Sequence, residues 1–302
     1  MIEHLDIADD VALALATDQP VVALESTIVT HGMPYPANVD TARAVEAVVR
    51  HEGAVPATIA IIDGRIRIGL SDAELDWLGT ARDVLKLSRA DLGFALAKGR
   101  HGSTTVAATM ICARLAGIGL FATGGIGGVH RGAETTFDVS ADLEELGRTD
   151  VCVVCAGAKA LLDLPKTLEY LETRGVPVIC YGTDDFPAFW SRSSGLPAPI
   201  RLDSPAEIAR MIVIRRELKL GGGILVANPI PQPDEIPWGE ISQTIGAAVA
   251  QAARRGIRGK AVTPFLLSHL LELTQGRSLV ANIALVKNNA LLAARIAREL
   301  CG

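Results

Sequence analysis

Two stretches, IGLFATGG at residues 118–125 and DVCVVCAG at residues 150–157, decide the fold class of this chain. Each is a short apolar run that ends in small residues, which is typical of a buried strand. A segment with helical periodicity, residues 141–147, lies between them. Strands that alternate with helices pair in parallel, because the helix returns the chain to the same end of the sheet. The pattern therefore predicts an α/β fold.

The same alternation continues in both directions from these two strands. Further strands are expected at 20–27, 176–182 and 222–231, and further helices at 6–17, 38–52, 72–79, 165–174, 238–255, 264–274 and 278–300. Another helix should begin at Ser103 or Thr104 and end at Gly117. Asp63-Gly64 joins two alternating runs, which predicts an antiparallel hairpin near residues 57–70. We expect one domain over residues 1–302, with a mainly parallel, mixed sheet flanked by helices on both faces.

Composition excludes several classes of protein. The net charge is −5 and no run is rich in Lys or Arg, which argues against nucleic acid as a partner. The longest apolar runs are interrupted by glycines, so no membrane span is expected. The acidic start of the chain and its five cysteines favour a cytoplasmic protein without a disulfide framework. Cys152 and Cys155 form a C-x-x-C pair, but on a strand they point to opposite faces, which argues against metal or redox use.

Chemistry is expected beyond the carboxyl ends of the strands, where open α/β sheets bind ligands. Four features follow predicted strands: Glu25, the glycine-rich turn TGGIGGVH ending at His130, Lys159, and Asn228. The turn lacks G-x-G-x-x-G spacing, so it does not indicate a dinucleotide site. It either presents backbone amides to a ligand or is a tight structural turn.

Lys159 and Glu25 are the candidates for catalysis. A partly buried lysine with a lowered pKa is suited to form a Schiff base, and the small residues before Lys159 would leave room for a substrate. The alternatives are a point charge for phosphate or an ion pair with Asp163. Glu25 follows four apolar residues, so it is either a general acid or a carboxylate that caps a turn or pairs with an arginine.

Two other motifs suggest an anion and a cation site. GSTTVAATM at residues 102–110 places Ser103, Thr104 and Thr105 at an expected helix start, which suits a phosphomonoester. No G-K-[ST] is present, so a nucleoside triphosphate is not expected. Asp142, in the SAD motif of residues 140–142, either caps a helix or binds a hard cation.

Several long motifs resemble one family, the pseudouridine-5′-phosphate glycosidases, also called indigoidine synthase A-like proteins. They are ALESTIVTHGMPYPAN, TTVAATM, FATGGIGGVHRGAETTFDVSADL, VVCAGAKALLDLPKTLEYLET and VANPIP, and the likeness covers about residues 18–299. It implies an α/β enzyme that reversibly converts pseudouridine 5′-phosphate and water into uracil and ribose 5-phosphate in pseudouridine catabolism. It also implies a homotrimer and Mn²⁺ as cofactor, with Mg²⁺ or another divalent ion as an alternative.

The resemblance assigns roles to individual residues. Lys159 matches the nucleophile, Glu25 the acid and Asp142 the metal-bound aspartate. The implied substrate contacts are Lys86, Thr105, Val106, His130, Ser140, Ala141, Asp142 and Asn282. The segment KGRHGSTT, residues 98–105, departs from the family pattern at His101 and Ser103.

The chemistry of the implied reaction accounts for a lysine beside an acid. Pseudouridine joins its sugar and base by a C–C bond, so protonation of a heteroatom leaving group does not suffice. We hypothesise that Glu25 protonates the ring oxygen and that Lys159 forms an imine with C1′ of the sugar. Two alternatives remain: another imine-forming phosphosugar lyase or aldolase, and a non-catalytic phosphosugar-binding accessory protein.

Overall fold

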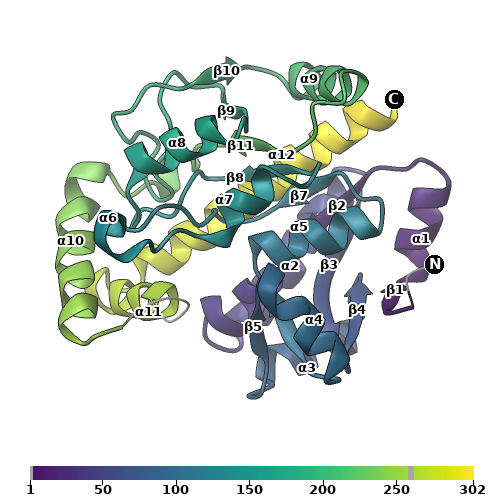
Figure 1. Ribbon diagram of the computed structural model, residues 1–302, viewed down its shortest axis with the longest axis horizontal. Helices are drawn as coiled ribbons and strands as arrows, with labels where there is room; N and C mark the ends of the chain where they lie inside the picture. Colours follow the sequence, from purple (N-terminus) through teal and green to yellow (C-terminus); the bar gives the residue numbers. More distant parts are fainter. Residues whose placement is uncertain (1–2, 258–261) are drawn as a thin grey trace.

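The computed structural model describes residues 3–257 and 262–302. Its strands are β1 (Leu5–Ile7), β2 (Val21–Leu24), β3 (Val55–Ile62), β4 (Arg65–Ile68), β5 (Leu85–Leu87), β6 (Gly102–Thr104), β7 (Leu120–Ala122), β8 (Cys152–Cys155), β9 (Val178–Tyr181), β10 (Ile200–Leu202) and β11 (Ile224–Ala227). Its α-helices are α1 (Asp9–Ala16), α2 (Ala37–His51), α3 (Asp72–Thr80), α4 (Arg89–Ala97), α5 (Val106–Leu115), α6 (Ala133–Thr136), α7 (Ala141–Leu146), α8 (Leu164–Thr173), α9 (Pro205–Glu217), α10 (Trp238–Arg254), α11 (Val262–Leu273) and α12 (Arg277–Cys301). A π-helical turn, η1 (Ile28–Gly32), and a 3₁₀ turn, η2 (Gln232–Asp234), complete the elements (Figure 1).

The strands form one mixed sheet in the order β1-β4-β3-β2-β7-β8-β11-β9-β10, with β6 joined to β3 and β5 joined to β6. All pairs along β3-β2-β7-β8-β11-β9-β10 are parallel, which confirms the mainly parallel sheet. β3 and β4 form the expected antiparallel hairpin. Asp63 and Gly64 both have positive φ in its turn, as a two-residue primed turn requires.

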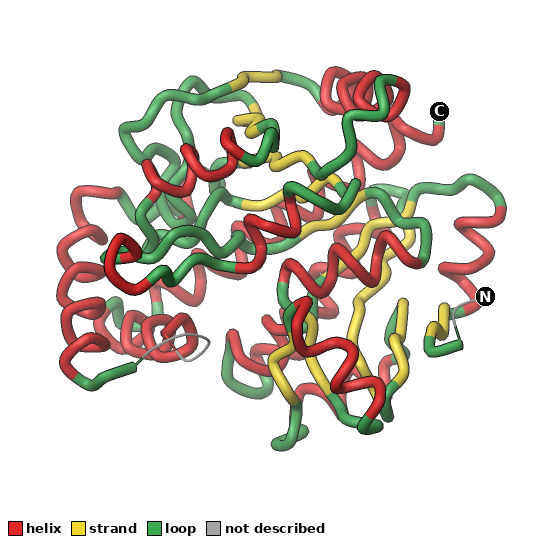
Figure 2. Tube along the Cα trace, in the orientation of Figure 1, coloured by secondary structure: helices red, strands yellow, loops and turns green. Residues whose placement is uncertain are grey.

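Helices cover the sheet from two sides, as the alternation predicts. α5 packs on β2, β3 and β7, and α12 crosses behind β2, β7 and β8 on the other side (Figures 1 and 2). α12 is long and apolar enough to cross a membrane by length and composition, which differs from the sequence expectation. Half of its apolar window is buried inside the fold, because it packs against the sheet and against α2 and α9. Its apolar residues are therefore those of a core helix.

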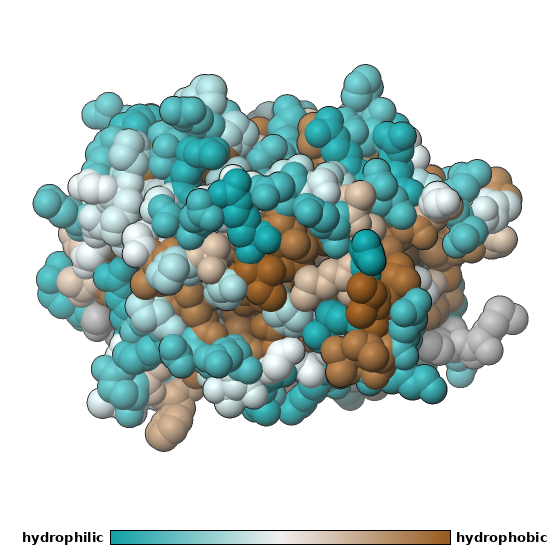
Figure 3. All heavy atoms as spheres, turned by 90° about the horizontal axis from the view of Figure 1, so that it is seen from above, coloured by the Kyte–Doolittle hydropathy of each residue, from teal (hydrophilic) through white to brown (hydrophobic). Residues whose placement is uncertain are grey.

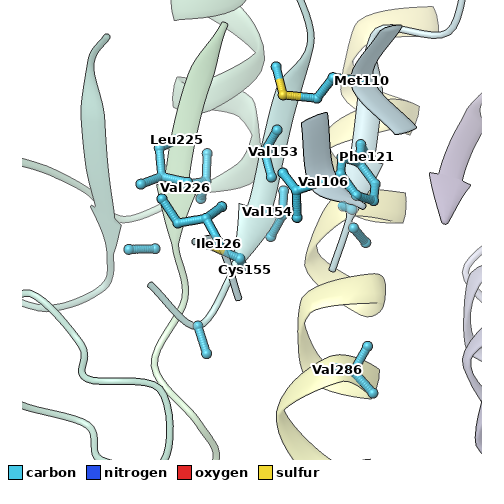
Figure 4. Close-up of a cluster of buried hydrophobic side chains, with 14 of the residues drawn as sticks. Val106, Met110, Phe121, Ile126, Val153, Val154, Cys155, Leu225, Val226 and Val286 are labelled. Atoms are coloured by element: carbon cyan, nitrogen blue, oxygen red, sulfur yellow. The ribbon is translucent and has the colours of Figure 1, made fainter. Parts of the chain in front are cut away.

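The core lies where α5 and α12 close on the central strands. Val153 and Val154 of β8 and Leu225 and Val226 of β11 are fully buried, and Met110 of α5 packs among the same side chains (Figure 4). Both faces of these strands are covered, which explains why they read as continuous apolar runs instead of alternating ones. This core holds the carboxyl ends of β2, β7 and β8 next to one another.

The structure corrects two element assignments at the margin of the sheet. Leu5–Ile7 forms β1, paired with β4, where a helix over 6–17 was expected. Gly102–Thr104 forms β6, so α5 begins at Val106 with Thr105 as its N-cap, in place of Ser103 or Thr104. In both cases pairing with a strand distant in sequence outweighs local helical propensity.

Candidate active site

Two adjoining cavities open at the carboxyl ends of β2, β7 and β8. Both are lined by Glu25, Thr27, Lys86 and Lys159, so they form one cleft with two lobes. The larger lobe, about 280 Å³, is called the polar lobe; besides the shared residues it is lined by Ser88, Thr105, Val106, Gly127, His130, Asp138, Val139, Ser140, Ala141, Asp142 and Leu162. The smaller lobe, about 70 Å³, is called the apolar lobe; it is lined additionally by Ile28, His31, Gly32, Met33, Gly124, Gly125, Phe189, Asn282 and Leu285.

The fold brings the predicted catalytic, metal and substrate-contact residues that the family resemblance named into this cleft. Glu25, Lys86 and Lys159 lie where the lobes meet. Thr105, Val106, His130, Ser140, Ala141 and Asp142 line the polar lobe, and Asn282 lines the apolar lobe. Asn228 is the exception among the strand-end residues, because its amide is buried against Asn288 and Asn289 of α12. Asn228 therefore joins α12 to the end of β11.

Lys159 follows β8 and its backbone N–H donates to the carbonyl of Ile126 at 3.1 Å. The ion pair with Asp163, one of the alternatives above, is absent. Asp163 pairs with Lys166 at 2.9 Å instead, and also accepts from the Lys166 backbone as the N-cap of α8. Among the described residues no carboxylate forms a salt bridge with Lys159. A lysine amine that lines a cleft without a counter-ion is available to a substrate.

The small residues before Lys159 are explained by packing. Ala156 and Ala158 are fully buried, and neither they nor Gly157 line the cleft. Gly157 has φ +85°, and a Cβ there would lie 2.5 Å from the carbonyl oxygen of Pro187. The expectation that these residues leave room for a substrate is therefore wrong, since they admit the loop that follows β9.

Glu25 follows β2 directly. The hydroxyl groups of Thr27 and Thr123 each donate a hydrogen bond to one of its two carboxylate oxygens. The arginine partner considered above is not found among the described residues. Two threonine donors fix the carboxyl group of Glu25 in the cleft that Lys159 also lines, so the two side chains can supply a proton donor and a nucleophile to one substrate.

Asp142 joins three elements at the floor of the polar lobe. Its Oδ1 accepts from the backbone N–H of Ala107 in α5 at 3.0 Å, and its Oδ2 accepts from Gly127 in the glycine-rich turn at 2.8 Å. Ser140, not Asp142, is the N-cap of α7. Asp142 therefore fixes the start of α5 relative to the turn, while both of its oxygens keep a lone pair.

Gly127 lines the cleft and is also tightly packed, so both interpretations of the glycine-rich turn apply to it. Its N–H binds Asp142 and it lines the polar lobe, yet a Cβ there would lie 2.2 Å from Ser140 Oγ and 2.8 Å from Asp142 Oδ2. Gly125 is similarly close to Phe189, with a Cβ at 2.7 Å from its ring. The turn is therefore both tightly packed and part of the cleft wall.

Replacing Gly127 by alanine should break this arrangement. We expect a loss of about 2–4 kcal/mol in the free energy of unfolding, because the N-cap of α7 and a charged hydrogen bond are both disturbed. Chemical denaturation measures it. Gly93→Ala is the matched control, since a Cβ at this α4 position meets nothing within 4 Å. Equal stability of the two variants would contradict the role given to Gly127.

The hydroxyl cluster before α5 is only partly in the cleft. Ser103 and Thr104 are fully buried in β6, and Thr104 Oγ1 donates to the carbonyl of Ile59 at 2.8 Å. Only Thr105 reaches the polar lobe, beside Val106. The expectation of three hydroxyl groups facing one phosphate is wrong, because β6 pairs with β3 and its side chains enter the core.

His130 and Lys86 complete the polar lobe. Burial lowers the pKa of His130 and the nearby Lys159 lowers it further, although Asp138 raises it. Ser88 and Asp138 were not predicted, although Asp138 lies inside the quoted motif TFDVSAD. Ser88 directly follows β5, so the strand-end rule would have found it had Leu85–Leu87 been recognised as a strand.

Most of the residues that line only the apolar lobe were not predicted from the sequence. Ile28, Met33 and Leu285 form apolar walls, and Phe189 lies over the glycine-rich turn. His31 is polar like Asn282 and the four shared residues, and it lies within the motif ALESTIVTHGMPYPAN. No single-sequence signal connects Phe189 to this lobe, because the loop after β9 folds back over β8.

Comparison with known proteins finds one family along nearly the whole chain. The family model described as indigoidine synthase A like protein matches residues 10–299. Proteins named pseudouridine-5′-phosphate glycosidase are similar over the whole chain. The one from Methylobacterium nodulans is 70% identical, covering 99% of this chain and 88% of its own. The one from Solibacter usitatus is 66% identical, covering 98% and 99%.

Two solved structures share the fold. The prealnumycin C-glycosynthase AlnA, in complex with ribulose 5-phosphate, superposes with a TM-score of 0.92 at 38% identity, covering 100% of this chain and 98% of its own. An indigoidine synthase A-like protein from Thermotoga maritima superposes with a TM-score of 0.89 at 34% identity, covering 99% and 97%. Family model, relatives and folds agree over nearly the full length. The chain belongs to the indigoidine synthase A like protein family.

Proposed function

We propose that this protein is a pseudouridine-5′-phosphate glycosidase, which cleaves the C–C bond between uracil and ribose 5-phosphate reversibly. The observation that carries the proposal is Lys159, an amine without an ion-pair partner among the described residues, beside Glu25 at the junction of the two lobes. The names of relatives up to 70% identical support the same activity. A site that keeps both the amine and the acid disfavours a non-catalytic accessory role.

The two lobes match the two halves of this substrate. The polar lobe receives the sugar phosphate, with Thr105 and Val106 placed in its wall to contact the phosphate. The apolar lobe receives the flat base against Phe189, and Asn282 supplies a polar contact. This placement puts the bond between base and C1′ next to Lys159, which lines both lobes.

The reaction then proceeds in four balanced steps. Glu25 gives a proton to the ring oxygen as the C1′–O4′ bond breaks, with electrons supplied by the uracil ring. The neutral amine of Lys159 adds to C1′, and the Glu25 carboxylate takes up the proton that the amine then loses. Glu25 delivers this proton to C5 of uracil, so that the lysine lone pair breaks the C1′–C5 bond and forms a protonated imine. Water hydrolyses the imine, which frees ribose 5-phosphate, restores the neutral amine and returns a proton to Glu25.

An absorbance assay tests the function. Purified protein incubated with uracil and ribose 5-phosphate should form pseudouridine 5′-phosphate, and the product should return to uracil on dilution with water. Aldolase substrates such as ribose 5-phosphate with a small carbonyl donor serve as the comparison for the alternative lyase. Turnover of those substrates without any exchange between uracil and its phosphosugar adduct would overturn the proposal.

A divalent cation fits the polar lobe through carboxylates and water. Within residues 3–257 and 262–302, no three His, Cys, Asp or Glu side chains are grouped to hold a metal ion. Asp142 and Asp138 both line the lobe, and Mn²⁺ or Mg²⁺ is often held by one or two carboxylates with water and a phosphate. Such a cation would neutralise phosphate or hydroxyl oxygens. We propose Mn²⁺ with Asp142 as its ligand and Asp138 as its neighbour.

Removal of the metal and of each carboxylate tests this assignment. Chelation should abolish turnover and added Mn²⁺ should restore it. Asp142→Asn is expected to need at least about tenfold more Mn²⁺ for half-maximal rate, because it removes a charged ligand. Asp138→Asn is the paired variant. If only Asp138→Asn raises the Mn²⁺ concentration needed for half-maximal rate, the ligand is Asp138 and not Asp142. If chelation leaves the rate unchanged, the reaction does not need a metal and the assignment is wrong.

The homotrimer and the cytoplasmic location are part of the same proposal. Several large apolar side chains are exposed, among them Tyr35, Phe137 and Val280. One face of the molecule shows apolar atoms gathered in its middle between hydrophilic margins (Figure 3). Exposed apolar surface of this kind is typical of association between chains. Light scattering coupled to size exclusion measures the number of subunits.

A further inference from the structure

The side-chain amide of Asn282 has a fixed orientation. Trp190 Nε1 donates a hydrogen bond to Asn282 Oδ1 at 2.7 Å. An indole N–H can only donate, so the atom facing it must be the amide oxygen, whichever way an Asn side chain is otherwise assigned. Trp190 is only 1% exposed, so water does not compete for this bond.

The loop after β9 holds Trp190 itself rigidly. The backbone carbonyl of Trp190 accepts a hydrogen bond from the backbone N–H of Ile236 at 2.9 Å. The indole ring of Trp190 packs edge-on against the ring of Phe189, with the ring centroids 5.1 Å apart. Phe189 lines the apolar lobe, and its backbone N–H donates to Ala156 at the end of β8. Trp190 is therefore anchored to the same strand that carries Lys159.

The fixed amide determines what Asn282 offers to a ligand. Its oxygen accepts from Trp190, and its nitrogen has no hydrogen-bond partner among the described residues. Asn282 lines the apolar lobe, so the amide nitrogen without a partner among the described residues is the group left to donate to a base there. A donor at this position suits a carbonyl group of a base and opposes an exocyclic amino group, because two donors would face each other.

Besides Asn282 and the four residues shared with the polar lobe, the apolar lobe is lined by the polar side chain of His31, whose chemistry is less selective. Its Nε2 is buried and has no hydrogen-bond partner within the described parts of the chain. Burial lowers the pKa of His31, and the positive charge of Lys86 lowers it further, so the imidazole is neutral. A neutral imidazole carries one donor and one acceptor nitrogen and can adapt its tautomer to either kind of group. Of Asn282 and His31, Asn282 is therefore the side chain that can distinguish between bases.

We propose that Trp190 is a positioning residue that sets base selectivity: by holding Asn282 Oδ1 it keeps the amide nitrogen toward the base, so that the apolar lobe selects uracil over cytosine. The inference rests on the proposed function and goes beyond it in naming what reads the base. Trp190 itself touches no reacting atom in this account.

The size of the effect follows from the population of the two amide orientations. With Trp190 in place, turning the amide would set an N–H against an N–H in a buried site, which keeps the turned form to roughly a few per cent. Trp190→Phe removes the donor, so both orientations become about equally populated. Apparent affinity scales with the competent fraction. Uracil should then bind about twofold more weakly and cytosine about tenfold more tightly.

Inhibition of pseudouridine 5′-phosphate cleavage by free uracil and by free cytosine tests this. Cleavage by the unchanged protein tests the proposed function first, so failure there is separate from failure of the inference. In Trp190→Phe the ratio of the cytosine to the uracil inhibition constant should fall about twentyfold. A merely structural role would weaken both bases alike, so an unchanged ratio overturns the proposal. Trp77→Phe, at a partly exposed tryptophan outside the cleft, is the matched control.

A second variant keeps the test decisive if Trp190→Phe does not fold. Asn282→Asp retains an oxygen for Trp190 and replaces the amide donor by a carboxylate acceptor. The protein should then bind cytosine more tightly than uracil, a reversal of preference. Continued preference for uracil by the unchanged margin would show that Asn282 does not read the base and would overturn the inference.

Discussion

Lys159→Ala should abolish turnover of pseudouridine 5′-phosphate and leave the fold intact. Removing a nucleophile that forms a covalent intermediate typically lowers kcat by about 10⁴-fold or more. No described carboxylate pairs with Lys159, so its loss leaves no uncompensated charge and the melting temperature should change little. Steady-state absorbance kinetics and a thermal scan measure the two quantities.

Chemical trapping separates the covalent role of Lys159 from its charge. Protein mixed with ribose 5-phosphate and reduced with borohydride should carry a sugar phosphate adduct on Lys159, located by mass spectrometry of peptides. Lys159→Arg keeps a positive charge but should neither turn over nor trap. Lys98, an exposed lysine at the end of α4, is the internal control and should stay unmodified. Turnover by Lys159→Ala within tenfold of the unchanged protein would contradict the imine mechanism.

Glu25→Gln should show the second-largest loss. The substitution keeps the shape of the side chain and hydrogen-bonding groups for Thr27 and Thr123 but removes the proton that opens the sugar ring. Loss of a general acid lowers the rate by about 10²–10⁴-fold. The effect should fall on kcat, with KM nearly unchanged, because Glu25 acts as the C1′–O4′ bond breaks. Initial rates over a range of substrate concentrations measure both constants.

The step that needs Glu25 can be isolated with the same trapping reaction. Free ribose 5-phosphate equilibrates with its open-chain aldehyde in solution, so it reaches Lys159 without an enzymatic ring opening. Glu25→Gln should therefore lose turnover of pseudouridine 5′-phosphate and still give the borohydride adduct. Glu25→Asp, which restores an acid on a shorter side chain, should recover part of the rate. Loss of trapping in Glu25→Gln would assign Glu25 to imine formation in place of ring opening.

Much of the architecture and the chemistry could be predicted from local patterns. The short apolar runs that became β7, β8, β9 and β11 are recognisable because buried parallel strands have no polar face. Glu25 follows β2 and Lys159 follows β8, and the topology of a parallel sheet places the carboxyl ends of these strands at the same edge. The sequence therefore predicts that Lys159 and Glu25 lie close together.

Other features depend on contacts between segments that are distant in sequence. The sequence of β6 has the pattern of a helix start, but in the structure it pairs with β3, and this pairing buries Ser103 and Thr104 in the core. The interpretation of Ala156–Ala158 as space for a substrate failed for the same reason. The loop that fills this space follows β9, and nothing in the local sequence of residues 156–158 predicts that this loop packs against them.

The sequence by itself predicted the α/β class and the strand-end lysine and glutamate, because each depends on local periodicity or on parallel strand order, and it named Asp142 and Thr105 through their motifs. Only the tertiary structure decided that the cleft has two lobes, that Asp163 belongs to Lys166, and that Trp190 turns the amide of Asn282. These are contacts between side chains on separate elements. Their geometry arises from the packing of these elements on a shared core, and local sequence patterns do not predict which distant segments will be in contact.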